Sequence, residues 1–253
     1  MDHKVVFITG AGSGMGQLYA RKMLAQGWKV AALDVNQSGL NELPDSPNLL
    51  RINVDVSDSQ AVLAAVQQTE SELGHIYRVV NAAGIMPLSR ILDQDISLIK
   101  KIMDINYGGL VNVAHATLPG LLERKSGEFV SFASLAGHLP VFYVGAYNAS
   151  KFAVIAYTEV LYQENRGRGV NFTCVCPPPV QTPLLNQARE TVWPKIFGIL
   201  PAISPETVIT KIDRALSKNK FWVFPGPVTK LSWVFRRYFP ALTWRFVRAY
   251  EGL

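Results

Sequence analysis

A tyrosine and a lysine with helical spacing form the strongest candidate for acid–base chemistry. Tyr147 and Lys151 are four residues apart in a segment with the pattern of a helix, so they lie one turn apart on the same face. A phenol with a pKa near ~10 is a weak base at neutral pH. A neighbouring ammonium favours the phenolate and lowers that pKa, which predicts an acid/base group at Tyr147. Taken alone, the pair could equally be a surface pair on a helix.

A glycine-rich turn near the start of the chain predicts a phosphate site. It lies between a predicted strand and a predicted helix, where glycine lets the backbone turn tightly and approach a pyrophosphate at the positive end of the helix. The strict dinucleotide-binding spacing is absent, because Met15 and Gln17 fall where it needs glycine. A plain structural turn is the alternative. The residues expected to contact the phosphates are Gly10, Gly12, Ser13, Gly14, Met15 and Gly16.

An acidic residue at the end of the second predicted strand indicates which dinucleotide binds. Asp34 follows Gly14 by 20 residues, where a carboxylate would accept hydrogen bonds from a ribose diol. A 2′-phosphate would be repelled there, and Val35 and Asn36 offer no cation to receive it. The alternative is that Asp34 caps a turn. Together with the glycine turn, it favours NAD over NADP.

The elements that must hold these residues alternate along the chain. Short apolar runs alternate with segments of helical spacing, which predicts βαβ units and a mostly parallel sheet covered on both faces. A helix is expected over 96–122, interrupted or bent near Gly108 and Gly109. The other expected strands are 5–9, 29–34, 49–54, 77–81, 127–133 and 170–176, and the other expected helices are 17–26, about 57–73 and 147–165.

Four motifs in register resemble the short-chain dehydrogenase/reductase family. They are the glycine turn from Thr9 to Gly16, the stretch 81–84, Ser134, and the Tyr147–Lys151 pair, and they span residues 4 to about 183. The resemblance implies a single Rossmann-type α/β domain with a doubly wound parallel sheet of about seven strands and helices on both faces. It also implies assembly as a homodimer or homotetramer, and a small-molecule substrate.

The same resemblance implies roles for individual residues. Ser134, 13 positions before Tyr147, would polarise the substrate oxygen, and Lys151 would also hold the nicotinamide ribose. Asn106 would complete a catalytic tetrad by fixing a water that links Lys151 to solvent. The further residues implied to contact the dinucleotide are Asp55, Val56, Asn81, Ala82, Ala83, Gly84, Tyr147, Lys151, Pro177, Val180 and Thr182.

The loop after the sixth strand departs from the family pattern. Pro178 stands where the family usually has glycine, which fixes φ and removes a backbone donor beside the expected nicotinamide position. Ser131 replaces a common Asn, and Ala133 replaces the first of two serines. Neither change removes a catalytic group.

Composition and charge exclude several other classes of protein. Hydrophobic residues make up 49% of the 253-residue chain, which excludes disorder, and no signal peptide or spanning helix is read. We expect a cytoplasmic protein, peripheral at the inner face of a membrane if the tail described below binds lipid. Cys174 and Cys176 are expected as buried thiols, and the scattered histidines indicate no metal site. His138 is expected in a solvated loop near Ser134.

One segment beyond the motifs bears on the substrate. Residues 183–205 are expected to form a lid over the substrate, and its apolar character suits a lipophilic alcohol or ketone. A lid can also be apolar only because it docks on the body. The lid's apolar residues are Leu184, Leu185, Trp193, Ile196, Phe197, Ile199 and Leu200.

A basic and aromatic tail follows the expected domain of residues 1–227. Residues 211–253 carry nine cations and two acids, and ten of the chain's 26 aromatic residues lie between Phe221 and Tyr250. Residues 228–253 are expected as a helical appendage divided or kinked at Pro240. It would either lie on anionic lipid or pack on a neighbouring subunit or over the lid. Nucleic acid is not expected, because no DNA-binding motif accompanies the charge.

The sequence therefore predicts an NAD-dependent oxidoreductase. It would transfer hydride between nicotinamide and a lipophilic secondary alcohol or ketone. One alternative is a fatty acyl (acyl-CoA) reductase of the same family. The other is a non-catalytic dinucleotide-binding regulator, against which the intact Ser134, Tyr147 and Lys151 argue.

Overall fold

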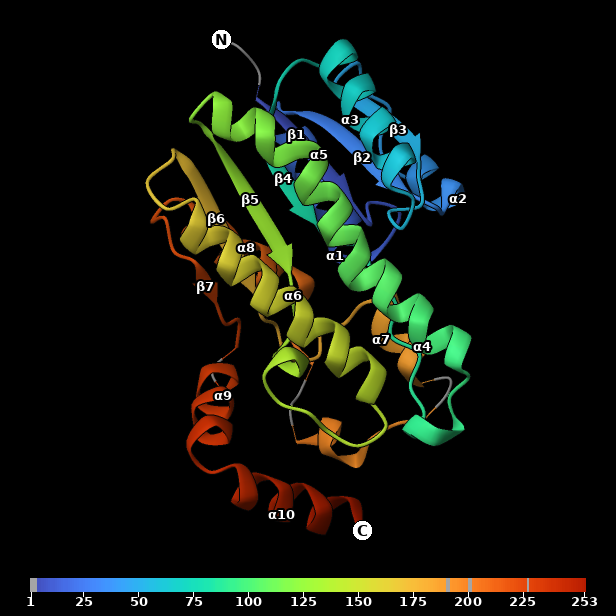
Figure 1. Ribbon diagram of the computed structural model, residues 1–253. Coiled ribbons are helices and arrows are strands. Elements are labelled where there is room, and N and C mark those ends of the chain that lie inside the picture. Colours follow the sequence, from blue (N-terminus) through green and yellow to red (C-terminus); the bar gives the residue numbers. More distant parts are fainter. Residues whose placement is uncertain (1–3, 190–191, 200–201, 227) are drawn as a thin grey trace.

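Seven parallel strands run through the centre of the computed structural model, which describes residues 4–189, 192–199, 202–226 and 228–253 (Figure 1). The strands are β1 (Val5–Thr9), β2 (Lys29–Asp34), β3 (Leu49–Asn53), β4 (Ile76–Asn81), β5 (Gly127–Phe132), β6 (Val170–Val175) and β7 (Trp222–Val223). Their order across the sheet is β3-β2-β1-β4-β5-β6-β7. The predicted single α/β domain with a seven-stranded doubly wound sheet is confirmed.

Helices cover both faces of the sheet, so most strand residues are buried and apolar. One face is covered by α1 (Gly14–Ala25) and α8 (Pro205–Leu216), through side chains such as Tyr19 and Ile212. The other is covered by α3 (Ser59–Glu72), α5 (Gly109–Glu123) and α6 (Gly145–Glu164), through side chains such as Leu110 and Val154. The short α2 (Gln37–Asn41) packs against β2 and β3.

The strand order reverses between β1 and β4, and this crossing point fixes where a ligand can bind. In open α/β sheets ligands bind at the carboxyl ends of the strands beside such a switch point. The register pairs Thr9 with Asn81, and Asn81 with Ser131. These polar residues therefore lie side by side at the edge where β1, β4 and β5 end.

The long helical segment before β5 is interrupted where the sequence predicted it. It comprises α4 (Ile96–Met103), a π-helical turn η2 (Asp104–Gly108) and α5. Gly108 and Gly109 have helical φ values of −56° and −58°. The interruption is the wider π turn, which ends at Gly108, and such turns are frequent at functional sites.

The lid segment leaves the sheet after β6 and returns to it before α8. It contains α7 (Pro183–Arg189) and the 3-10 turn η4 (Lys195–Gly198). Its two ends are joined by a parallel bridge between Val180 and Ile203. Gln187 of α7 accepts a hydrogen bond of 3.1 Å from the backbone N–H of Met86, just beyond β4. Leu200, one of the expected lid residues, lies outside the described residues.

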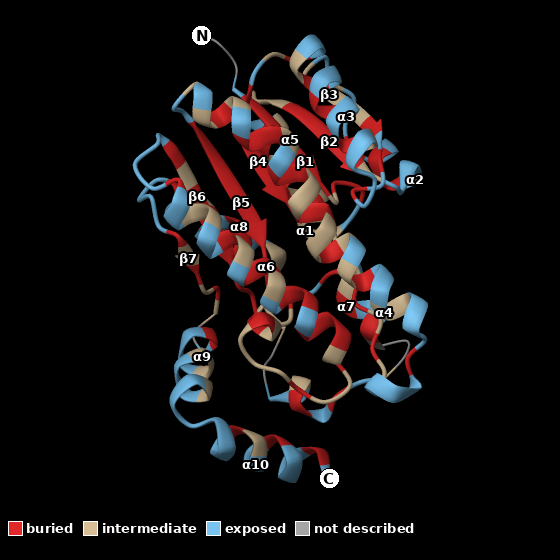
Figure 2. Cartoon of the chain, viewed as in Figure 1, coloured by how far each residue is buried: buried red, intermediate tan, exposed pale blue. Residues whose placement is uncertain are grey.

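The tail forms two helices at the end of the molecule that carries the lid (Figure 1). They are α9 (Thr229–Tyr238) and α10 (Pro240–Glu251), so the prediction that Pro240 divides the tail is confirmed. Figure 2 shows both helices largely exposed, in contrast to the buried strands. Within the described part of the chain, no helix combines the length and apolar character needed to cross a bilayer.

An aromatic cluster around His138 attaches α9 to the body. The His138 ring lies within 5.2–5.8 Å of the rings of Trp222, Phe224 and Trp233. Burial, together with the charge of Arg237, lowers the pKa of His138 to about 4. The expectation that His138 is a solvated loop residue is wrong, because the tail helix and β7 cover it.

The lowered pKa of His138 predicts acid sensitivity. A folded-state value below the usual 6.5 means that the unfolded chain binds the proton more readily, so stability should be lost as pH falls from about 6.5 towards 4. His138→Phe keeps an aromatic ring but cannot be protonated. We expect the melting temperature of this variant to fall less between pH 7 and pH 4.5 than that of the wild type. The same change at the exposed His75 is the matched control, and an equal flattening there would contradict the prediction.

Candidate active site

Tyr147 and Ser134 meet where α6 begins and β5 has just ended. Tyr147 is in the first turn of α6, and its side chain is buried. Ser134 caps the 3-10 turn η3 (Leu135–Gly137), accepting a hydrogen bond of 3.0 Å from the N–H of Ala136. Both side chains line the same pocket, and Ser134 is near enough to act on the pKa of Tyr147. The structure thus brings the predicted acid/base and its predicted partner to one pocket wall.

Lys151 lies one turn further along α6 and points to the same region. Its Nζ is 5.6 Å from the centre of the Tyr147 ring and donates a hydrogen bond of 2.8 Å to the carbonyl oxygen of Phe132. Only 5% of the residue is exposed. Burial lowers the pKa of Lys151 to about 8, so this ammonium loses its proton at a lower pH than a surface lysine does.

The pKa of Tyr147 differs from the expectation. A lowered value was predicted from the nearby ammonium, whereas burial raises the pKa of Tyr147 to about 12, against the smaller lowering effect of Ser134. The physical reason is that burial of the phenolate raises the pKa more than the nearby ammonium lowers it. The ammonium of Lys151 donates its own hydrogen bond to Phe132. At neutral pH Tyr147 therefore holds its proton.

Asn106 lies in the π turn η2 and is 1% exposed. Its Nδ2 donates to the Ile85 carbonyl and to Ser150 Oγ, both at 3.0 Å, while its Oδ1 accepts from the Ile85 N–H at 2.8 Å. Asn106 thus ties the segment after β4 to α6. Ser150 is a site residue that the sequence analysis missed, although its place between Tyr147 and Lys151 was a usable signal.

The glycine turn is closed tightly against its neighbours. A Cβ on Gly16 would lie 2.1 Å from the Gly10 carbonyl oxygen, so no larger residue fits there. Gly10 has φ of +70°, and its Cβ would lie 2.7 Å from the backbone nitrogen of Ala83. The N–H of Gly12 donates to Asp34 Oδ2 at 2.9 Å. Asp34 therefore holds the turn as well as facing the groove beside it.

A groove of about 680 Å³ runs along the carboxyl ends of β1, β2 and β4. Twelve of the predicted dinucleotide-contacting residues line it: Gly10, Ser13, Gly14, Met15, Gly16, Asp34, Asp55, Val56, Ala82, Ala83, Gly84 and Thr182. Gly12 and Asn81, which were also predicted to contact the dinucleotide, are not among the residues that line the groove. Asn81 accepts a hydrogen bond of 3.0 Å from Thr9 Oγ1, which in turn accepts from the N–H groups of Ala82 and Ala83. Thr9, the first residue of the glycine-turn motif, therefore supports the groove although no contact with the dinucleotide was predicted for it.

An apolar pocket opens beside Tyr147 and shares part of its wall with the groove. Met15, Ala82, Gly84, Thr182 and Leu184 line both hollows. Of the remaining predicted site residues, Ser134, Tyr147, Lys151, Pro177 and Val180 line the pocket, whereas Asn106 lines neither hollow. Pro178, the departure from the family pattern, is a buried part of the same wall. Lys101, Ile105 and Gln187 also line the groove, and no motif marked them in the sequence.

Comparisons with known proteins agree with this geometry. The sequence pattern of the family described as short chain dehydrogenase matches residues 4–193. A ketoacyl reductase of Nostoc is 32% identical over 86% of this chain and 76% of its own length. The 17-beta-hydroxysteroid dehydrogenase 13 of Mus musculus is 29% identical over 92% of this chain and 77% of its own length.

Solved structures of short chain dehydrogenases have the same fold as this chain. A short chain dehydrogenase/reductase from Burkholderia phymatum in complex with NAD superposes with a TM-score of 0.86 at 25% identity, covering 95% of each chain. A short chain dehydrogenase from Burkholderia cenocepacia in complex with NADP superposes with a TM-score of 0.82 at 22% identity, covering 96% of this chain and 97% of that one, and shows the fold.

The fold, the groove and the adjoining pocket define a dinucleotide-binding oxidoreductase. The chain belongs to the short chain dehydrogenase family.

Proposed function

We propose that this protein is an NAD-dependent enzyme that interconverts a lipophilic secondary alcohol and its ketone, with Tyr147, Ser134, Lys151 and Asn106 as its catalytic set. The observation that carries the proposal is that Tyr147, Ser134 and Lys151 line one apolar pocket that adjoins the dinucleotide groove. A homodimer or homotetramer stays a prediction from the family resemblance, and light scattering would measure it.

The groove fits a dinucleotide. Its glycine turn leaves no space for a Cβ at Gly16, and it lies at the amino end of α1, where backbone N–H groups favour a phosphate. Gly10, Ser13, Gly14 and Met15 would hold the pyrophosphate. When bound, the dinucleotide supplies the hydride donor or acceptor.

The chain's own residues handle the proton at the substrate oxygen. Because burial keeps Tyr147 protonated at neutral pH, its hydroxyl can donate a proton to a ketone oxygen as that oxygen becomes an alcohol. Ser134, which lines the same pocket, donates a hydrogen bond to the same oxygen. The apolar wall around both excludes water that would compete for the proton.

Lys151 and Asn106 support Tyr147 from behind. Lys151 would return a proton to Tyr147, a role for which a pKa of about 8 is suited, since the group gives up its proton near neutral pH. It would also hold the nicotinamide ribose. Asn106 acts as a positioning residue, because its amide is occupied by Ile85 and Ser150.

NAD is the proposed dinucleotide because of the charge around Asp34. The carboxylate lines the groove and repels a 2′-phosphate, while its neighbours Val35 and Asn36, which also line the groove, carry no charge. The N–H groups of Gly12 and Asn36 fix the orientation of the carboxylate with hydrogen bonds of 2.9 and 2.8 Å. Each carboxylate oxygen keeps a lone pair for a ribose hydroxyl.

A lipophilic substrate is proposed because the pocket walls offer few polar groups. Beyond Ser134, Tyr147, Lys151 and Thr182, the wall is built from apolar side chains and glycine. The apolar residues furthest along it come from the segment after Ser134 and from the lid: Leu139, Val141, Val144, Leu184, Leu185, Ile196 and Phe197. The names of two relatives mention a hydroxysteroid and a ketoacyl group, and both descriptions suit such a wall.

A graded series of ketones tests the proposal. With purified protein and NADH, we expect kcat/KM for 2-ketones to rise with chain length, by about 3- to 4-fold for each methylene that enters the pocket, since burying a CH₂ is worth about 0.8 kcal/mol. Loss of NADH absorbance measures the rate. Ketones of the same length with a terminal hydroxyl are the control and should gain less. Absence of turnover across the series, with aldehyde released from acyl-CoA instead, would favour the acyl reductase alternative.

A further inference from the structure

The tail helices use only one face to attach to the rest of the molecule. On α9, Trp233 stacks on Phe224 with ring centres 5.2 Å apart. On α10, the Trp244 ring meets the Phe142 ring edge-on at 5.4 Å, and Val247 is buried in the same cluster as Tyr147. This inner face accounts for some of the tail's aromatic residues, and it packs over the lid, as one of the two readings of the sequence expected.

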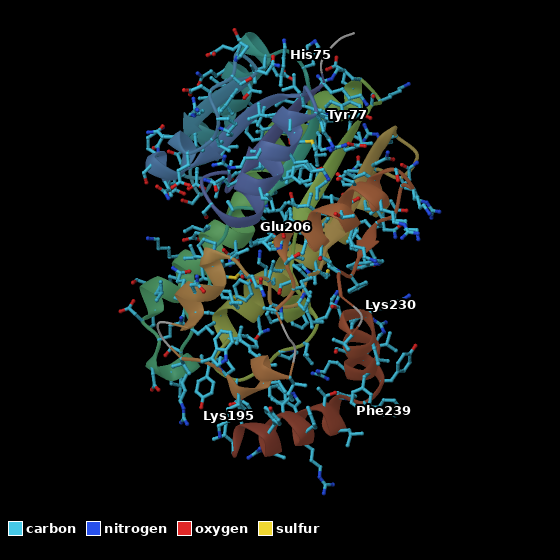
Figure 3. All side chains as sticks on the ribbon, turned by 180° about the vertical axis from the view of Figure 1, so that it is seen from behind. His75, Tyr77, Lys195, Glu206, Lys230 and Phe239 are labelled. Atoms are coloured by element: carbon cyan, nitrogen blue, oxygen red, sulfur yellow. The ribbon has the colours of Figure 1, made fainter. Side chains whose placement is uncertain are left out.

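The end of α10 is hydrogen-bonded to the lid itself. The Glu251 carboxylate accepts a bond of 2.9 Å from the N–H of Ile196, and Lys195 Nζ donates to the Glu251 carbonyl at 3.1 Å. Figure 3 shows the labelled Lys195 beside the end of this helix. Ile196 also lines the substrate pocket, so the tail and the pocket wall are one packed unit.

An outer surface of the tail, opposite Trp233 on α9 and beside the docked residues on α10, is apolar and exposed. Neither the core nor the lid uses it, although a helix docked by one face normally carries polar residues on the other. On α3, for example, Gln60, Gln67 and Gln68 are exposed. The exposed apolar residues of the tail are Leu231, Val234, Phe235, Tyr238, Phe239, Leu242, Phe246, Tyr250 and Leu253. They recur every three or four residues within each helix, and the Phe235 and Phe239 rings lie 5.4 Å apart where the helices meet. These residues are termed here the outer stripe.

Five cations accompany the outer stripe, and the tail has almost no compensating acid. They are Lys230, Arg236, Arg237, Arg245 and Arg248. None of them takes part in an ion pair among the described residues. The tail's single acid, Glu251, is already occupied by Ile196. Figure 3 shows Lys230 on α9 and Phe239 at the junction of the two helices.

We propose that the outer stripe of α9 and α10 docks on the surface of an anionic lipid bilayer. Apolar and aromatic side chains entering the headgroup boundary, with arginine and lysine around them, are typical of helices that lie in that interface. A second copy of this chain fits less well, because a two-fold contact would bring the same five cations against each other with no acid between them.

Docking in this way would bring the lid side of the substrate pocket to the lipid surface, because α10 is bonded to η4. A lipophilic substrate could then pass between bilayer and pocket without crossing water. This consequence rests on the proposed function, whereas the docking itself does not.

The test measures binding of the full chain to vesicles without any turnover. Vesicles of phosphatidylcholine with 30% phosphatidylserine, roughly the anionic content at which surface attraction becomes strong, are sedimented with the protein. We expect co-sedimentation at low salt and release by sodium chloride at about 0.5 M, because surface charges are then screened. Vesicles of phosphatidylcholine alone should bind less protein. A protein that stays in the supernatant with anionic vesicles at low salt would overturn the proposal.

A matched pair of variants assigns the binding to the outer stripe. Leu242→Ser with Phe246→Ser changes two side chains that are 51% and 53% exposed, and should lower the vesicle partition coefficient by about tenfold or more. Leu92→Ser with Ile96→Ser changes two side chains that are 97% and 70% exposed elsewhere, and should leave it unchanged. Unchanged melting temperatures check that both variants fold.

Two results would contradict the assignment. Equal vesicle binding by the tail variant and the wild type would show that the outer stripe is not the contact. A smaller oligomer of the tail variant in light scattering, with no vesicle binding by the wild type, would make a second copy of the chain the occupant. Neither vesicle sedimentation nor light scattering measures catalysis. Both therefore test the docking proposal even if the ketone assay shows no turnover.

Discussion

Tyr147→Phe should lower kcat for ketone reduction by about 100- to 10,000-fold, the usual contribution of a positioned acid or base. The change removes one hydroxyl, which is the proposed proton donor at the pocket wall. It leaves the ring in its buried place at the start of α6. Because the groove that would hold the dinucleotide is formed by other residues, the Kd for NADH should stay within a few-fold. NADH absorbance measures the rate, and fluorescence titration measures the affinity.

Tyr157→Phe is the matched control for this experiment. Tyr157 is on the same helix, and its ring meets the Tyr107 ring edge-on at 5.7 Å, away from the pocket wall. The same atom is removed from the same element, so any loss caused by a general weakening of α6 would occur here too. A Tyr147→Phe enzyme that keeps more than a tenth of the wild-type rate would show that another group moves the proton.

Six of the seven strands could be predicted from the sequence because each is a short run rich in apolar and β-branched residues. β1 is nearly all apolar, and β2, β4, β5 and β6 are mostly buried, with a few polar residues among them. β7 consists only of Trp222 and Val223, too few residues to show any period. The helix α8 was not assigned either, although Ser204 caps it and Pro205 begins it, which is a typical start signal.

The arrangement of the site could be predicted in outline, because motif order fixes which strand ends meet. What the sequence could not supply is the effect of packing. The pKa of Tyr147 depends on how completely its neighbours enclose it, and that enclosure comes from segments far apart in the chain, including Val247 of the tail. The buried pair of Arg78 and Glu128, with Tyr19 hydrogen-bonded to Arg78 at 2.7 Å, shows the same limit. Nothing in the sequence spacing of Tyr19, Arg78 and Glu128 predicts that these three side chains meet.

The tail shows why sequence alone left two readings open. Its apolar residues cover a broad part of each helix, so the pattern does not indicate which of them contact the body and which stay exposed. Only the tertiary contacts of Trp233, Trp244 and Val247 divide them into a docked face and an exposed one. Packing over the lid and contact with lipid are therefore compatible, because different side chains would serve each.

Asp34→Ala combined with Val35→Arg should shift preference from NAD towards NADP. Removing the carboxylate removes its repulsion of a 2′-phosphate, and a guanidinium can form charge-assisted hydrogen bonds with that group. Such bonds contribute about 1.5–3 kcal/mol, which corresponds to about 10- to 100-fold in the ratio of the two Kd values. Val35 is 63% exposed, so an arginine there enters solvent at the rim of the groove without a burial cost.

The ratio of affinities is the decisive quantity, because Asp34 also holds the glycine turn. Without the hydrogen bonds from Gly12 and Asn36 to Asp34, NAD and NADP should both bind more weakly and by a similar factor. The turn would contact the pyrophosphate that both dinucleotides contain. Asp45→Ala is the matched control: that exposed carboxylate pairs with Arg51, outside the groove, and should leave the ratio unchanged. Fluorescence titration gives all the Kd values. Equal affinity of the wild type for NAD and NADP would contradict the assignment of NAD, because the carboxylate at Asp34 would then repel nothing.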